Sequence, residues 1–295
     1  MTKAKKIITD ILVVAVVGYF LAIVAMVAMQ RQLMYHLTWR IEQSPAVYHL
    51  EVVHYKTADG LDLMAWYVPP KAHMPVIVLF HGNAGTIANR APTAAYFSKQ
   101  GYGFLLVEYR GYGGNPGSPS ENGFYSDGRA AMRWLMQKQH IKEQDIIIYG
   151  QSIGTGPASQ MAVEYKSARA LVLEAPFSNM PDEACATYPW ICPFKSFTLD
   201  KYDNIVKAPY FDMPTLIVDG TDDDVIPHSQ GADLAAAVGA PFKKYVLIKG
   251  AGHNDLRRFG LLPLISKFLA ELPHVNEKTD GRFAGLPSGI VRHRD

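Results

Sequence analysis

The residues with the clearest chemical potential are 150–154, which read Gly-Gln-Ser-Ile-Gly with Ser152 at the centre. They follow an apolar run, residues 145–149, and open a helix-compatible segment near Ile153. In a G-x-S-x-G pattern with this context, a buried strand delivers the serine into a turn that only glycine tolerates. The helix that follows directs its N-terminal dipole at the hydroxyl. A serine hydroxyl needs a base to take its proton, so the pattern predicts a carboxylate and a histidine downstream, in the order serine, acid, histidine.

Candidates for both partners lie at the ends of later apolar runs. Residues 214–219 predict a buried strand, and the loop after it carries three consecutive carboxylates at residues 222–224. Residues 244–249 alternate like a half-buried strand and lead into a glycine-rich turn that contains His253. A triad acid belongs on such a loop, where it accepts the imidazole N–H and holds its tautomer. We therefore expect His253 to be the base. The residues alone leave open which aspartate is the acid, or whether all three are solvated turn residues.

A fourth candidate element follows the short apolar run 75–80. The turn after it, residues 81–85, reads His-Gly-Asn-Ala-Gly. An acyl-transfer enzyme needs two N–H donors aimed at the oxygen that becomes negative in the tetrahedral intermediate, and small residues let a backbone approach a substrate. We expect these donors to be the main-chain N–H groups of Asn83 and Ile153. His81 precedes the glycine of this turn, and we interpret it as structural.

As a set, these segments resemble the α/β-hydrolases. The match is to the membrane-associated branch of α/β-hydrolase-domain serine hydrolases, which includes protein depalmitoylases and their bacterial relatives. The resemblance spans about residues 45–272 and rests on residues 81–85, 109–114, 117–121, 150–154, 174–177, 220–226 and 250–255. It implies a mostly parallel eight-stranded sheet flanked by helices. It also implies cleavage of carboxylic ester or thioester bonds through an acyl-enzyme. In that family the acid is the third residue after the glycine, which implies Asp223 rather than Asp222 or Asp224.

Two departures from the family bear on the substrate. Pro227 stands where depalmitoylase-like members often carry an acid, and the cysteine-rich N-terminal segment of the eukaryotic enzymes is replaced by an apolar anchor. The expected substrate is therefore only a small-molecule or lipid-like acyl ester or thioester. Acyl length and the preference among ester, thioester and amide stay open.

Two other functions stay open as alternatives. An aminopeptidase-like serine peptidase of the same fold would need a larger cap with acidic groups to hold a substrate amine. A catalytically silent, membrane-bound interaction module would not need all four site elements intact. A haloalkane or epoxide-type hydrolase is disfavoured, because its nucleophile would be an aspartate where this chain has Ser152.

Composition limits the remaining classes. The 295 residues, 48% of them hydrophobic, suffice for one α/β domain with a large core. A net charge of +2, with scattered basic residues, argues against a nucleic-acid partner. No metal-ligand spacing and no phosphate-binding glycine loop appear, so we expect no metal and no cofactor. For Cys185 and Cys192 we favour two unpaired buried thiols, and the alternative is a disulfide in an oxidising compartment.

The N-terminus carries a candidate membrane anchor. Residues 11–29 contain no charge and are long enough to cross the hydrocarbon core as one helix. A cleavable signal peptide would end in an A-x-A pattern, which is missing here. Three lysines before the run, against two arginines after it, predict a cytoplasmic N-terminus and a domain on the other side of the membrane. Gly18 and Ala22 form a small-xxx-small pair that leaves the oligomeric state open.

These observations predict five regions. They are an anchor (1–30), a linker (31–44), an α/β-hydrolase domain (45–272), a short cap within it (176–213) and a flexible tail (273–295). Eight strands are expected at residues 47–55, 61–68, 76–80, 104–108, 146–149, 171–173, 216–218 and 245–248. The alternation breaks down in the cap, which is rich in aromatic residues. Tyr188, Trp190 and Phe194 could shape an acyl pocket there, and the alternative is that they only pack the cap on the core.

Overall fold

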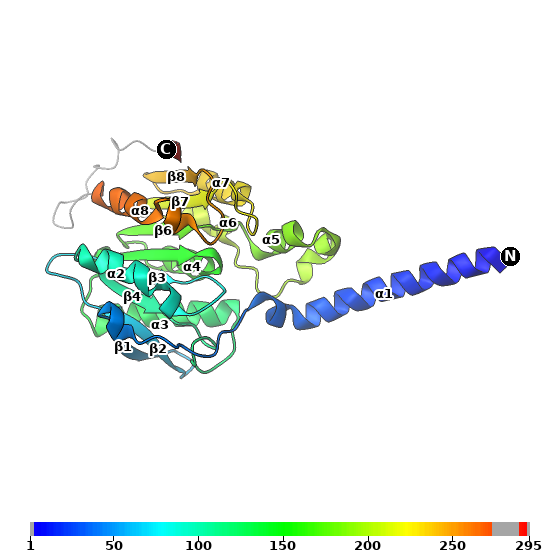
Figure 1. The fold of residues 1–295 in the computed structure, drawn as a ribbon, viewed down its shortest axis with the longest axis horizontal. Coiled ribbons are helices and arrows are strands. Elements are labelled where there is room, and N and C mark those ends of the chain that lie inside the picture. Colours follow the sequence, from blue (N-terminus) through cyan, green and yellow to red (C-terminus); the bar gives the residue numbers. More distant parts are fainter. Residues whose placement is uncertain (1–2, 273–288, 294–295) are drawn as a thin grey trace.

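The fold is organised around one mixed sheet with the strand order β1-β2-β4-β3-β5-β6-β7-β8-β9 (Figure 1). It is seen in a computed structural model, which describes residues 3–272 and the main chain of residues 289–293. β1 (Glu51–Lys56), β2 (Asp62–Val68) and β4 (Gly103–Val107) pair antiparallel in that order. The parallel part consists of β3 (Val76–Phe80), β5 (Ile146–Gln151), β6 (Ala170–Glu174), β7 (Thr215–Gly220) and β8 (Lys243–Ile248), with β3 also parallel to β4.

All eight expected strands are present, so the predicted mostly parallel sheet is confirmed. The central strands read as continuous apolar runs because helices cover both of their faces. The sequence did not predict a ninth strand, β9 (Gly289–His293), which pairs parallel with β8 at the sheet edge. This strand falls in the segment expected to be a tail, and the other residues of that segment lie outside the described part of the chain.

Helices pack on the two faces of the sheet according to the alternation of the strands. Val76, Val78 and Phe80 of β3 face one core, and Ile77 and Leu79 face the other. The first core is covered by α3 (Glu121–Gln137), α4 (Thr155–Glu164), α6 (Asn204–Lys207) and α7 (His228–Ala237). The second is covered by α2 (Ala91–Lys99) and α8 (Leu261–Ala270).

The N-terminal helix α1 (Lys3–Met34) projects away from the rest of the molecule (Figure 1). It continues past residue 30, so the boundary expected between anchor and linker falls inside the helix. Its C-terminal end is fixed to the domain by the buried carboxylate of Asp200. The Arg31 guanidinium donates two hydrogen bonds to it, at 2.8 and 3.0 Å, and the Tyr35 hydroxyl donates another at 3.1 Å. Arg31 is half exposed, but the Asp200 carboxylate is buried and would be costly to leave without these donors, so this end of α1 is an integral part of the fold.

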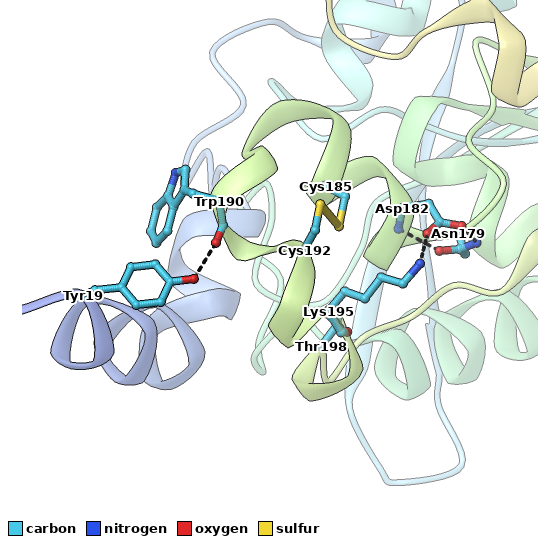
Figure 2. Close-up of a disulfide and its surroundings, with 8 residues drawn as sticks. All are labelled: Tyr19, Asn179, Asp182, Cys185, Trp190, Cys192, Lys195 and Thr198. Atoms are coloured by element: carbon cyan, nitrogen blue, oxygen red, sulfur yellow. Dashed lines mark hydrogen bonds and ion pairs between the residues drawn. A yellow bond between two sulfur atoms is a disulfide. The ribbon is translucent and has the colours of Figure 1, made fainter. Parts of the chain in front are cut away.

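The cap contains α5 (Met180–Thr187) and the 3₁₀ segment Pro189–Phe197 (Figure 2). A disulfide joins Cys185 to Cys192, so the favoured interpretation of two unpaired thiols is wrong. The chain turns back sharply between the two helices, which brings the Cα atoms of the cysteines to 5.1 Å. This separation is within the range that a disulfide bridges.

The junction between β5 and α4 packs tightly against the end of β3, and it generates a prediction about stability. A Cβ atom on Gly154 would lie 2.0 Å from the Phe80 carbonyl oxygen and 2.7 Å from that of His81. Both oxygens belong to the main chain, which cannot yield without disturbing the sheet. We expect Gly154→Ala to lower the free energy of unfolding by about 2 kcal/mol or more, measured by urea denaturation in detergent.

Gly252→Ala is the matched control, because its new Cβ would meet only Asp222 and Asp255, at 3.5 and 3.6 Å. It should change the free energy of unfolding by less than about 1 kcal/mol. An equal loss in both variants would refute the steric explanation.

Candidate active site

Ser152 occupies the sharp turn between β5 and α4, at the carboxyl end of its strand. Its φ of 52° lies in the left-handed region, which is costly for a residue with a side chain. The turn is held in place by close packing on both sides, because a Cβ on Gly150 would come within 2.6 Å of the Ala158 side chain. A strained serine between two obligatory glycines is the geometry that the sequence pattern predicted for this turn.

His253 lies between the serine and a carboxylate. Its Nε2 is 2.9 Å from Ser152 Oγ, and its Nδ1 is 2.8 Å from Asp223 Oδ2. The three residues come from the loops after β5, β7 and β8, and they meet because the carboxyl ends of parallel strands share one edge of the sheet. A neutral imidazole that donates Nδ1–H to the carboxylate leaves Nε2 free to accept the serine proton.

The surroundings of Asp223 keep it ionised. Its side chain is fully buried, and its second oxygen accepts the N–H groups of Val225 and Ile226 at 2.9 and 2.8 Å. Burial opposes the charge, but the hydrogen bond and charge of His253 and these two N–H groups outweigh it. The pKa of the Asp223 carboxyl therefore lies below its ordinary value. Asp222 and Asp224 are exposed instead, so the structure brings only Asp223 of the three to the histidine.

The turn at residues 81–85 lies directly against the serine. A Cβ on Gly82 would be 3.4 Å from the Ser152 Cβ. The Asn83 side chain holds this turn to the end of α1: its Nδ2 donates to the Met34 carbonyl at 2.5 Å, and its Oδ1 accepts the His36 N–H at 3.0 Å. The Tyr112 hydroxyl donates to the same oxygen at 2.8 Å. With the amide side chain engaged in this way, the main-chain N–H is the group that Asn83 can offer to a ligand.

Two buried glutamates, Glu108 and Glu174, form hydrogen bonds that stabilise the loops around the serine. His81 Nε2 lies 2.8 Å from Glu108 Oε1, and both side chains are inaccessible to solvent. Glu174 accepts hydrogen bonds from the Tyr149 hydroxyl and from Gln151 Nε2, and burial raises the pKa of its carboxyl. The contact with Glu108 holds the His81 ring away from the serine hydroxyl, in agreement with the structural role predicted for this histidine.

A cavity of about 970 Å³ opens beside Ser152 and His253. Its lining is mostly apolar and includes the polar side chains of Arg90 and Arg257. Of the three aromatic residues predicted for a pocket, Tyr188 and Phe194 line this cavity. Trp190 does not, because its ring packs edge-on against Tyr19 and its carbonyl accepts the Tyr19 hydroxyl at 2.8 Å (Figure 2). Within the described part of the chain, no three His, Cys, Asp or Glu side chains come together as a metal site.

The contribution of α1 to the cavity was not predicted from the sequence. Six of its residues line the cavity, namely Ile23, Met26, Val27, Gln30, Leu33 and Met34. Their spacing of three and four places them on one face of the helix. Apolar side chains that face a pocket do not differ in type from those that face lipid, so the sequence carries no signal that separates the two faces.

Comparison with known proteins places this geometry in a family. A family model described as the alpha/beta hydrolase fold matches residues 75–191. The chain is 37% identical over 221 residues to an uncharacterized protein of Mycobacterium tuberculosis, covering 73% of this chain and 78% of that one. It is 30% identical over 224 residues to alpha/beta hydrolase domain-containing protein 17B of Homo sapiens, covering 73% and 74%. With protein bem46 of Schizosaccharomyces pombe the identity is 31%, covering 67% and 68%.

Solved structures agree on the fold. An esterase of Pyrococcus furiosus, Pf2001, superimposes with a TM-score of 0.68 at 16% identity, covering 81% of this chain and 98% of that one. The acetyl xylan esterase of Paenibacillus sp. R4 gives a TM-score of 0.61 at 18% identity, covering 83% and 99%. At these low identities the structural likeness shows only a shared fold. The relatives at 30% identity or more show common ancestry. The chain belongs to the α/β-hydrolase family, in the branch of the α/β-hydrolase domain-containing proteins.

Proposed function

We propose that this member of a hydrolase family is a membrane-anchored serine hydrolase that cleaves carboxylic ester or thioester bonds. The observation that carries the proposal is the hydrogen-bonded series from Asp223 through His253 to Ser152, at the wall of a largely apolar cavity. The same three groups in this arrangement perform acyl transfer on several unrelated folds.

The first half-reaction forms an acyl-enzyme. Ser152 Oγ attacks the carbonyl carbon while His253 Nε2 takes the hydroxyl proton, and the Asp223 carboxylate stabilises the imidazolium that results. The carbonyl oxygen becomes negative and accepts the main-chain N–H groups of Asn83 and Ile153. His253 then passes its proton to the leaving oxygen or sulfur, the C–O or C–S bond breaks, and the alcohol or thiol departs.

The second half-reaction releases the acid. A water molecule gives its proton to His253 Nε2 and attacks the acyl carbon. Collapse of the second tetrahedral intermediate breaks the bond to Ser152 Oγ, which recovers the proton from the imidazolium. The residues of this chain supply every proton transfer in the cycle, so the mechanism calls for no cofactor.

The lining of the cavity favours an ester substrate over a peptide with a free amino group. Glu183 is the only carboxylate among the residues that line the cavity in the described part of the chain. It already accepts hydrogen bonds from Gln230 and Thr187, and burial raises its pKa. An aminopeptidase-like site would need a free, ionised carboxylate at this place to pair with the substrate amine.

The membrane part of the proposal rests on α1. The helix has 32 residues and reaches a mean hydropathy of 2.9 in its most apolar window, and among its residues only Ile23 is buried. A secretory signal sequence would also be apolar, but the contacts of Arg31 and Tyr35 with Asp200 favour a helix that stays attached. We place the N-terminus in the cytoplasm and the hydrolase domain on the opposite side. The disulfide between Cys185 and Cys192 supports that orientation, because disulfides persist in oxidising compartments.

The nucleophile is tested directly by covalent labelling. Ser152→Ala should abolish labelling of the full-length protein by a fluorophosphonate probe, because the probe reacts with an activated serine. His253→Ala should reduce labelling sharply, since the hydroxyl then lacks its base. Label that persists on the Ser152 variant, read by in-gel fluorescence, would remove this assignment.

The acid is tested by three parallel substitutions. Asp223→Asn should lower kcat/KM for a p-nitrophenyl ester by about 10⁴-fold, because the amide favours the wrong imidazole tautomer. Asp222→Asn and Asp224→Asn serve as matched controls and should stay within about twofold of the parent. The choice of acid is wrong if one of these two controls is the crippled variant.

The position of the oxyanion turn is tested at Asn83. Asn83→Ala keeps the main-chain N–H but removes the side-chain hydrogen bonds to Met34 and His36 that position the turn. We therefore expect kcat to fall by roughly 10- to 100-fold with little change in KM. Tyr112→Phe removes only one hydrogen bond to the same side chain and should have a much smaller effect on kcat. Equal kcat values for the parent and Asn83→Ala would show that the side chain does not position the turn.

A further inference from the structure

We propose that the acyl chain of the substrate reaches Ser152 from within the bilayer, through the seam between α1 and the cap. In this arrangement α1 forms one wall of the acyl site and sets the accepted chain length. The inference rests on the proposed serine-hydrolase function and goes beyond it, because it assigns a substrate-binding role to the membrane helix.

The first step is that α1 and the catalytic residues border one cavity. Ile23, Met26 and Val27 line the same space as Ser152 and His253. They lie on one face of α1, while Leu21 on the opposite face is 64% exposed. An acyl group on the serine therefore has an apolar path to follow along the helix.

The second step is that the cap follows α1 over several turns. At one end, the Tyr19 hydroxyl donates to the Trp190 carbonyl (Figure 2), and Phe20 packs edge-on against Phe194 at 6.1 Å. At the other end, Gln30 Oε1 accepts the Leu199 N–H at 2.7 Å. From Tyr19 to Gln30 the helix rises roughly 16 Å. The seam is thus long enough to hold much of a fatty acyl chain.

The seam between α1 and the cap lies at the depth of the hydrocarbon core. The uncharged run 11–29 would occupy the hydrocarbon core, which is about 30 Å thick, and the cap lies beside its second half. The side chains of the cap that do not line the cavity match that position, since Trp190 is 44% exposed and Leu199 is 59% exposed. Such aromatic and aliphatic groups gather where a protein surface meets lipid.

Charge on the cap is compatible with this depth. Lys195 is the one charged residue between residues 189 and 197. Its ammonium pairs with Asp182 at 2.7 Å (Figure 2), and its long apolar stem can bring the charged end towards the membrane surface. Arg90 and Arg257 of the domain also line the cavity, and their polar groups suit a hydrated leaving group.

The inferred substrate is therefore an ester or thioester with a long acyl chain that still lies in the bilayer. Its chain would pass from lipid to the side chains of α1 and the cap without crossing water. This avoids the free-energy cost of exposing an apolar chain to water. An acylglycerol and an S-acylated peptide share this chemistry, and they differ in the group that leaves.

The wall is tested with the full-length protein in phosphatidylcholine vesicles. Val27→Trp places a large ring in the seam and should lower the ratio of kcat/KM for a 16-carbon ester to that for a 4-carbon ester by at least about tenfold. Ile23→Trp provides a second variant in case the first does not fold. Leu21→Trp, with the same substitution on the opposite face, should keep the ratio of the parent. Equal ratios in Val27→Trp, Ile23→Trp and Leu21→Trp would overturn the proposed wall.

The depth of the cap is tested by quenching tryptophan fluorescence with phospholipids brominated along the acyl chain. The difference between the parent and Trp190→Phe isolates the contribution of this residue. Acyl-chain bromine should quench that contribution more strongly than aqueous acrylamide does, and the reverse order would overturn lateral access.

The last arm identifies the source of the chain. An acylglycerol and an S-acylated peptide are each placed in the same vesicles as the protein. Turnover of either one supports the acyl site, and the faster one identifies the leaving group. Hydrolysis of the short soluble ester with no turnover of either long-chain substrate would overturn this inference alone. Absence of fluorophosphonate labelling at Ser152 would instead overturn the proposed function.

Discussion

The site depends on one steric constraint, the contact between the β5–α4 turn and the end of β3. The register of the sheet pairs Phe80 with Gly150, and Gly154 packs directly on the Phe80 carbonyl oxygen. The turn that carries Ser152 and the turn at residues 81–85 are therefore continuations of two hydrogen-bonded neighbours. Strand pairing brings these two turns side by side, the Asn83 side chain fixes the second one to the end of α1, and the left-handed backbone at Ser152 is maintained by the packing of Gly154.

Local patterns were sufficient to single out Ser152 and His253, which the structure brings into contact, because each follows a recognisable strand and stands among glycines that the turn geometry requires. They were insufficient for the acid. Asp222, Asp223 and Asp224 are equivalent as sequence, and family resemblance was needed to choose among them. The structure separates them through tertiary contacts, namely burial and the N–H groups of Val225 and Ile226. A pattern of residue types does not encode which of three adjacent side chains turns inward.

The contribution of α1 to the lining of the cavity could not be predicted for a related reason. The helix α1 is apolar on the face that lines the cavity and on its exposed face alike, so the hydrophobic periodicity of its sequence does not distinguish the two faces. Pairing of Cys185 with Cys192 depends on how the chain turns between two short helices, which no spacing rule specifies. Contacts across long stretches of chain, such as Tyr35 with Tyr202, likewise appear only once the fold exists.

The buried carboxylate of Asp200 has a consequence for the order in which the protein is assembled. Its partners Arg31 and Tyr35 are 169 and 165 positions earlier in the chain. At a translation rate of about 5–20 residues per second, these two side chains wait roughly 10–30 s for their acceptor to be synthesised. In the membrane-anchored arrangement proposed above, lipid solvates the whole circumference of the first helix during that interval. In that arrangement, docking of the segment around Asp200 would displace lipid acyl chains from one face of α1.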